Sequence, residues 1–171
     1  MNRPAEGTYN PYFGTYISKV EGNNILPILK KQLHDLEVFL KEIPSEKWSY
    51  SYGEGKWTLA ESWIHVNDTE RIFSYRALRI SRGDQTPLPG FEQDDYVPFY
   101  SAKNRSAESI IEEFVTIRKA SLSLLESLDA EGWNRTGTAS NHKISVKAIA
   151  FILAGHAEHH LRITQEKYLA S

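Results

Sequence analysis

The sequence predicts an all-α protein, a single four-helix bundle with a long crossover between its second and third helices. Apolar residues recur at spacings of three and four along four long segments, which is the pattern of helices with one buried face. No segment shows the strict alternation that predicts a half-buried strand. The 171 residues are enough for one compact core. We therefore expect residues 1–171 to form one domain, with the bundle core spanning about 24–169.

The first two predicted helices span residues 24–43 and 58–82. The first has a continuous apolar face. The second begins with a capping box, in which Thr58 and Glu61 each satisfy a free backbone amide. It ends at Gly83, the residue type that most often follows a helix.

The last two predicted helices span residues 106–128 and 145–169. The apolar face of the fourth continues through two histidines, in the order Val146, Ile149, Leu153, His156, His160 and Ile163. Both histidines therefore occupy positions where the pattern predicts buried side chains.

Two connections join the later helices. Residues 83–105 form a long linker with three prolines and a cluster of aromatic and acidic residues. A loop of this length inside a bundle is uncommon and often functional. It could also run the length of the bundle and leave the second and third helices parallel. Residues 132–143 are predicted to be a second, polar linker.

The composition excludes several classes of partner. A net charge of −2 offers no basic patch for nucleic acid and no polybasic segment for a membrane surface. No run approaches the roughly 20 apolar residues of a membrane span, and the N-terminal residues lack the apolar core of a signal peptide. We expect a cytoplasmic protein with a small-molecule substrate. Without cysteine, any metal site must use His, Asp or Glu.

The histidines of the fourth helix are the main candidates for chemistry. His156 and His160 are four residues apart, so a helix places them on one face, where they could bind one metal ion. The third candidate ligand is His65; Glu61 or Asp68 could orient its ring, although capping the helix is the favoured role for Glu61. Spacing alone leaves the alternative open that each is an ordinary buried histidine bonded to a carboxylate or carbonyl, and it favours an interfacial role for His65. His159 points about 100° away from His160 and is not expected to be a ligand.

The long linker contains a second group of candidates. Asp94 and Asp95 could form an acid/base pair beside Tyr96. Solvated acidic residues are nevertheless commoner in loops than catalytic ones.

Three stretches of the chain resemble the DinB-like superfamily, also called DinB/YfiT-like metalloenzymes. They are residues 55–73, the turn and acidic segment at 88–97, and Gly155-His156-Ala157-Glu158-His159-His160-Leu161. The resemblance implies a four-helix bundle in which one histidine of the second helix and two of the fourth bind a divalent metal. These map onto His65, His156 and His160, with zinc or nickel as the expected ion. Characterised relatives include S-transferases and isomerases that use the low-molecular-weight thiols bacillithiol or mycothiol. Homodimers are common among them, so the resemblance also implies a homodimer for this chain.

These inferences favour a metal-dependent enzyme, such as a thiol-dependent S-transferase. Three neutral imidazoles leave coordination positions open for water or substrate, as in catalytic rather than structural sites. The alternatives are a metal-dependent hydrolase and a non-catalytic metal-binding or structural bundle. A cleft beside the metal, lined by Asp94, Asp95 or Tyr96, would favour an enzyme.

Overall fold

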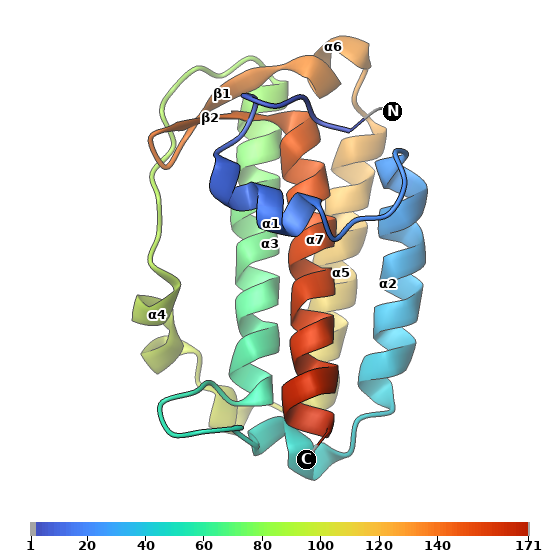
Figure 1. Cartoon of the computed structure of the whole chain (residues 1–171), viewed down its shortest axis with the longest axis vertical. Coiled ribbons are helices and arrows are strands. Elements are labelled where there is room, and N and C mark those ends of the chain that lie inside the picture. Colours follow the sequence, from blue (N-terminus) through green and yellow to red (C-terminus); the bar gives the residue numbers. More distant parts are fainter. Residues whose placement is uncertain (1–2, 171) are drawn as a thin grey trace.

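Four long helices form the body of the molecule (Figure 1). The computed structural model describes residues 3–170, and its long helices are α2 (Ile25–Lys41), α3 (Leu59–Ser81), α5 (Ala107–Glu126) and α7 (Val146–Ile163). Helix α3 packs against α5 and α7, and α2 packs against the same two helices. The four helices therefore enclose a common core, which confirms the predicted all-α bundle.

The long connection after α3 is a crossover. In Figure 1, α3 and α5 run in the same direction, while α2 and α7 run in the opposite one. The intervening chain returns along the outside of α3 and contains α4 (Gln93–Tyr96) and two 3-10 turns, Val97–Phe99 and Ala102–Asn104. A further 3-10 turn, Ser45–Ser49, lies between α2 and α3. The predicted crossover is thus confirmed.

The segment expected to be a polar linker is ordered secondary structure. The short helix α6 (Ala130–Asn134) is followed by β1 (Thr136–Ala139) and β2 (His142–Ser145), which pair as an antiparallel hairpin. Its two turn residues, Ser140 and Asn141, have φ values of 50° and 63°. Positive φ at both positions is the requirement of the type I′ turn that matches the twist of paired strands. The prediction of a strandless linker was therefore wrong.

The residues before the bundle also fold onto it. A 3-10 turn, Pro11–Phe13, leads into α1 (Gly14–Ile17), which crosses α7 at Gly155. A Cβ atom on Gly155 would lie 2.1 Å from the Tyr16 carbonyl oxygen, so glycine is required for this close approach. The crossing places Tyr16 beside the next residue of α7, His156.

The ends of the helices follow the predicted caps, with one exception. Thr58 Oγ1 accepts a hydrogen bond from the Glu61 amide at 3.2 Å, and Glu61 Oε2 accepts one from the Thr58 amide at 2.7 Å. Gly83 follows α3 with φ of 82°. The last predicted helix, however, changes to a π-helix over Thr164–Leu169. None of the helices in residues 3–170 combines the length and the apolar character needed to cross a bilayer.

One buried polar network ties all four long helices together. Arg118 of α5 donates to both carboxylate oxygens of Glu70 on α3, at 2.7 and 2.8 Å, and to Gln32 Oε1 on α2 at 2.8 Å. Gln32 Nε2 in turn donates to the carbonyl oxygen of Ala154 on α7 at 2.9 Å. The Arg118 side chain is fully buried, so its charge is neutralised and hydrogen-bonded inside the core.

Candidate metal centre

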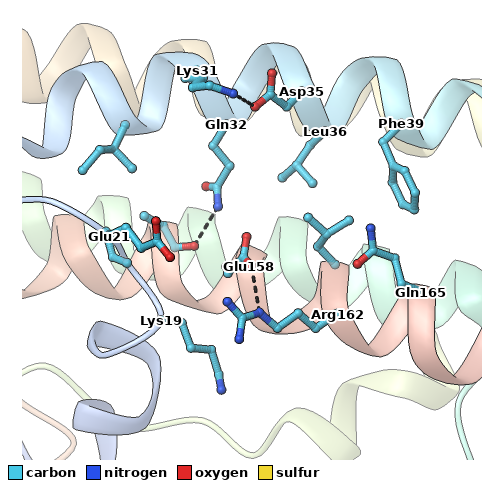
Figure 2. A pocket seen from close by; sticks show the side chains of 14 residues that line it. Lys19, Glu21, Lys31, Gln32, Asp35, Leu36, Phe39, Glu158, Arg162 and Gln165 are labelled. Carbon is cyan, nitrogen blue, oxygen red and sulfur yellow. Dashed lines mark hydrogen bonds and ion pairs between the residues drawn. The ribbon is translucent and has the colours of Figure 1, made fainter.

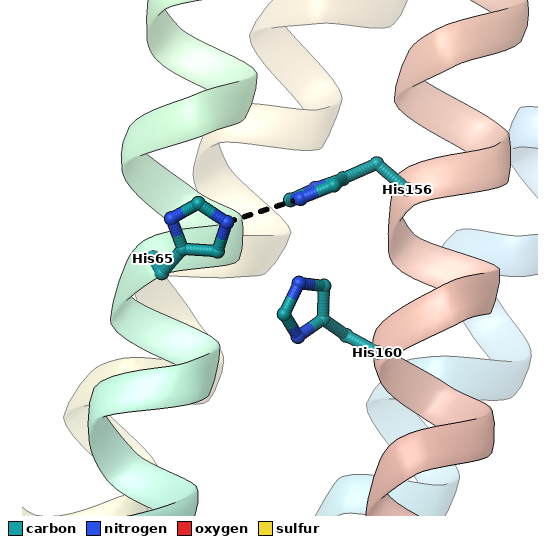
Figure 3. A group of neighbouring side chains, drawn as sticks. All are labelled: His65, His156 and His160. Carbon is teal, nitrogen blue, oxygen red and sulfur yellow. Dashed lines mark hydrogen bonds between the residues drawn. The ribbon is translucent and has the colours of Figure 1, made fainter. Parts of the chain in front are cut away.

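Three histidines converge between α3 and α7 (Figure 3). His65 projects from α3 toward His156 and His160, which project from successive turns of α7. The candidate donor atoms of the three rings all lie within 4.8 Å of one another, and His65 Nε2 is 3.1 Å from His156 Nε2. The three residues are 3%, 7% and 7% exposed, so the cluster is buried in the bundle.

Neighbouring hydroxyl groups hold two of the rings. The Ser62 hydroxyl lies 2.9 Å from His160 Nδ1, and the Thr69 hydroxyl lies 3.4 Å from His65 Nδ1. In the tautomers whose Nδ1–H groups donate to these hydroxyls, the Nε2 lone pairs stay free to bind a metal.

The two carboxylates expected to orient His65 have other partners. Glu61 is engaged in the capping box, and Asp68 pairs with Arg71 at 3.5 Å. Glu61 therefore has the capping role that the sequence favoured, and the suggestion that Asp68 orients the His65 ring was wrong. Thr69, one turn further along α3, takes that place.

The surroundings keep the three imidazoles neutral. Burial lowers the pKa of His65 to about 4, with a smaller contribution from nearby His159. Burial also lowers the pKa of His156 and of His160 well below the usual range, and the other ring charges of the cluster act in the same direction. The neutral imidazole is the form that binds metal.

His159 lies beside the cluster and is not part of it. It is half-buried, and its ring centroid is 5.4 Å from that of Tyr16. The Tyr16 ring is also 5.3 Å from the His156 ring, edge to face, so α1 covers this side of the cluster. Burial raises the pKa of Tyr16, which keeps its phenol protonated.

A cavity of about 320 Å³ opens onto His65 and His156. Its walls come from five parts of the chain: the N-terminal segment, α3, the crossover, the hairpin turn and α7. They include Phe13, Tyr16, Thr69, Phe73, Arg76, Phe91, Glu92 and Ser140. The cavity is small, and its walls combine aromatic rings with the polar side chains of Thr69, Arg76, Glu92, Gln93 and Ser140.

A second cavity, of about 350 Å³, borders His160 from the other side. Asp94 lines it, together with Trp57, Ser62 and Tyr168. Of the three loop candidates, only the exposed Asp94 lines a cavity that one of the three histidines also lines. Asp95 is exposed and lines neither cavity, while the Tyr96 ring packs on Phe91 at 5.8 Å.

A larger cavity of about 570 Å³ lies between α2 and α7 (Figure 2). It contains none of the three histidines, and several of its charged groups pair with one another, including Glu158 with Arg162 at 2.8 Å. The volume of a cavity alone therefore does not identify the candidate metal centre in this protein.

Several residues of the site were not predicted from the sequence. Ser62, Thr69 and Arg76 share the face of α3 that carries His65, because the spacings 62, 65, 69, 73 and 76 follow the helical repeat. That repeat was the signal that could have found them. Tyr16 lies outside the predicted bundle core, and nothing in its local sequence indicated a contact with His156.

Comparisons with known proteins agree with this architecture. The sequence model of the family described as the DinB superfamily matches residues 28–164. A protein of Oceanobacillus iheyensis, whose name provisionally assigns it as a metal-dependent hydrolase, is 26% identical over 148 residues, covering 77% of this chain and 84% of that protein.

A solved structure has the same fold. YfiT from Bacillus subtilis, described as a probable metal-dependent hydrolase with an unusual four-helix bundle topology, superposes with a TM-score of 0.72 at 14% identity. The match covers 95% of this chain and 91% of YfiT.

Proposed function

The chain belongs to the DinB superfamily, and from this premise we propose that it is a divalent-metal-dependent hydrolase of a small molecule. One observation carries the proposal: three buried imidazoles converge, two of them line one cavity and the third lines another, and no acidic residue or further histidine within residues 3–170 joins their group. Three protein ligands and an open position are characteristic of catalytic metal sites.

We propose His65, His156 and His160 as the ligands, and zinc or nickel as the ion. The donor set fits, because imidazole suits both ions and burial keeps all three rings unprotonated. Ser62 and Thr69 would orient the ligand rings through Nδ1. A bound divalent ion supplies a Lewis acid that lowers the pKa of water toward neutrality.

Other side chains would bind substrate and move protons. Asp94 lines the same cavity as His160, so its carboxylate is the best-placed proton acceptor among the three loop candidates. The phenol of Tyr16 stays protonated beside His156 and can donate a hydrogen bond from Oη to a bound substrate. The aromatic rings of Phe13, Phe73 and Phe91 would pack against the apolar part of a bound substrate.

The Oceanobacillus relative supports hydrolysis over thiol transfer, because its name provisionally assigns it as a metal-dependent hydrolase. The thiol-dependent S-transferase stays a prediction, and no residue of either cavity argues specifically for a thiol. The homodimer, the cytoplasmic location and the absence of a nucleic-acid partner also stay predictions. A non-catalytic bundle is less favoured, because two cavities border the histidines.

The metal site is tested by elemental analysis of purified protein and two matched variants. His160→Ala removes a proposed ligand and should abolish stoichiometric binding of zinc or nickel. His159→Ala removes the adjacent histidine, which lies outside the cluster, and should keep metal content near wild type. Equal losses in both variants, or no metal binding by the wild type after reloading, would contradict the proposed ligands.

The reaction is tested separately with metal-loaded protein. We expect hydrolysis of members of an ester and amide panel, and its loss in His160→Ala. A parallel screen offers an electrophile with bacillithiol, mycothiol or glutathione. Thiol conjugation without hydrolysis would replace the hydrolase by the transferase, and inactivity in both screens would favour the non-catalytic bundle.

A further inference from the structure

Arg76 is a buried cation in the wall of the cavity that opens onto His65 and His156. The residue is 3% exposed and lies on α3. Its Nη2 donates to the Pro89 carbonyl oxygen at 2.8 Å and to the Ser140 hydroxyl at 3.1 Å. Nothing within residues 3–170 accepts a hydrogen bond from its Nε or Nη1, and these two nitrogens are not sealed from solvent.

The other buried arginine, Arg118, has a carboxylate partner. Arg118 binds both oxygens of the Glu70 carboxylate and is thereby neutralised. Arg76 forms no ion pair with any carboxylate of the described chain, and aromatic rings border it instead: its guanidinium lies 4.8 Å from the centre of the Phe73 ring and 5.8 Å from that of Phe91. A buried guanidinium without a counterion is costly, so its retention at a cavity indicates an anionic ligand.

The position of Arg76 suits a ligand that also reaches the histidines. His65, Thr69, Phe73 and Arg76 form one stripe along α3, and all four line the same cavity. The guanidinium lies over Phe73, one turn back toward His65. The other charged group of this cavity wall, Glu92, is exposed and makes no ion pair with Arg76.

We propose that Arg76 binds an oxyanion of the substrate, a carboxylate or a phosphate group, through its free Nε and Nη1 donors. The substrate class is therefore a small anionic molecule whose apolar body packs between the aromatic walls while its reactive group faces the histidines. This assignment rests on the proposed function for the reaction, whereas the anion site depends on Arg76 alone. A planar guanidinium is well suited to such two-point recognition.

The test measures binding to metal-free protein from which the chelator has been dialysed away. Benzoate, phenyl phosphate and neutral benzamide are titrated separately by isothermal titration calorimetry, which serves for every variant, and the Arg76 Nε–H resonance is an additional NMR probe in the wild type. We expect at least one anion to bind about tenfold or more tightly than benzamide, since charge-assisted hydrogen bonds exceed neutral ones by that order. Which anion binds more tightly distinguishes a carboxylate substrate from a phosphate one.

Variants separate charge recognition from a structural effect. Arg76→Gln should weaken anion binding about 10- to 100-fold and leave benzamide binding unchanged, whereas Arg76→Lys should retain part of the preference. Arg79→Gln, on the same helix and outside the cavity, is the matched control and should bind both anions like wild type. Equal binding of anions and benzamide, no binding of either anion, or an unchanged preference in Arg76→Gln would overturn the proposal. Because no metal is present, a failure of hydrolysis leaves this result standing, and a failure of anion binding leaves the metal centre standing.

Discussion

At the scale of single residues, the candidate centre depends on the groups that hold the imidazole rings as well as on the rings themselves. His160 has a well-formed contact from Nδ1 to the Ser62 hydroxyl at 2.9 Å, whereas the Thr69 contact to His65 is longer, at 3.4 Å. Both hydroxyls come from α3. The helix that provides one proposed ligand thus also positions a ligand of α7.

We predict that Ser62→Ala lowers metal affinity about 10- to 100-fold, which is the usual cost of losing a partner that orients a ligand. The His160 ring would lose the acceptor that fixes its tautomer, while the fold stays intact. Competition with a chromogenic chelator measures the affinity. Ser74→Ala, which removes a serine of α3 bonded to Ser121 and not to a histidine, is the control and should bind like wild type. If both variants keep wild-type affinity, Ser62 has no orienting role.

The sequence predicted the three histidines better than the residues that surround them. His156 and His160 stood out because they occupy apolar positions of the helical repeat. His65 was the third candidate, and the family resemblance favoured it as a ligand over an interfacial histidine. The juxtaposition of all three agrees with that expectation. Ser62, Thr69 and Arg76 were missed because small or polar residues on a helix usually face solvent, and only the contact with α7 and the crossover shows that this face is buried.

At the scale of elements, the docking of α1 on α7 forms one side of the candidate site. The approach is so close that residue 155 has no room for a side chain. Tyr16, which α1 carries, then covers His156 and borders the cavity. A packing constraint at one glycine therefore determines whether the site is closed on this side.

We predict that Gly155→Ala displaces α1 and destabilises the protein by about 1–3 kcal/mol, the usual cost of overpacking a tight contact. The added Cβ would lie 2.1 Å from the Tyr16 carbonyl oxygen, which belongs to the backbone and cannot rotate away. Urea unfolding measures the loss, and limited proteolysis before residue 24 reports the release of α1.

Gly14→Ala provides the control for that substitution. A Cβ atom there meets no atom within 4 Å, and Gly14 has helical φ and ψ of −56° and −32°. Alanine should be neutral or slightly stabilising at this position. Equal destabilisation by both substitutions would show that loss of glycine flexibility, and not the contact with Tyr16, is responsible.

The sequence predicted the elements that are long enough to show a clear periodicity of apolar residues. Each long helix carries several turns of apolar spacing, so its existence and approximate limits were clear. The strands β1 and β2 have four residues each, too few for alternation to be distinguished from a loop. Their turn, Ser140-Asn141, is stabilised by contacts that are distant in sequence, including that between the Ser140 hydroxyl and Arg76.

At the scale of the whole molecule, the bundle buries two polar groups of different character. The Arg118–Glu70–Gln32 network is internally satisfied and links four helices. The histidine cluster is buried and neutral, and its rings satisfy one another only in part. Protonation of the cluster would place charge in the core without a counterion, so the stability of the metal-free protein should depend on pH.

We predict that the metal-free protein loses stability as the pH falls from about 6.5 to about 4. The folded-state pKa values of His65, His156 and His160 lie below the unfolded value of roughly 6.5. In this window the unfolded chain binds protons that the folded chain does not, so the free energy of unfolding decreases with decreasing pH. His65 alone, with a folded pKa of about 4, accounts for roughly 3 kcal/mol.

Urea unfolding between pH 7.5 and pH 5 measures this effect largely above the range in which carboxylates titrate. His65→Asn should give a shallower dependence, because one titrating ring is removed. His159→Ala is measured in parallel, because burial also lowers the pKa of this half-buried neighbour. Its contribution to the pH dependence can then be subtracted. A free energy of unfolding that stays constant over this interval would show that the folded protein accepts protons at the cluster as readily as the unfolded chain does. The imidazoles would then not be held in the neutral form that the proposed metal centre requires.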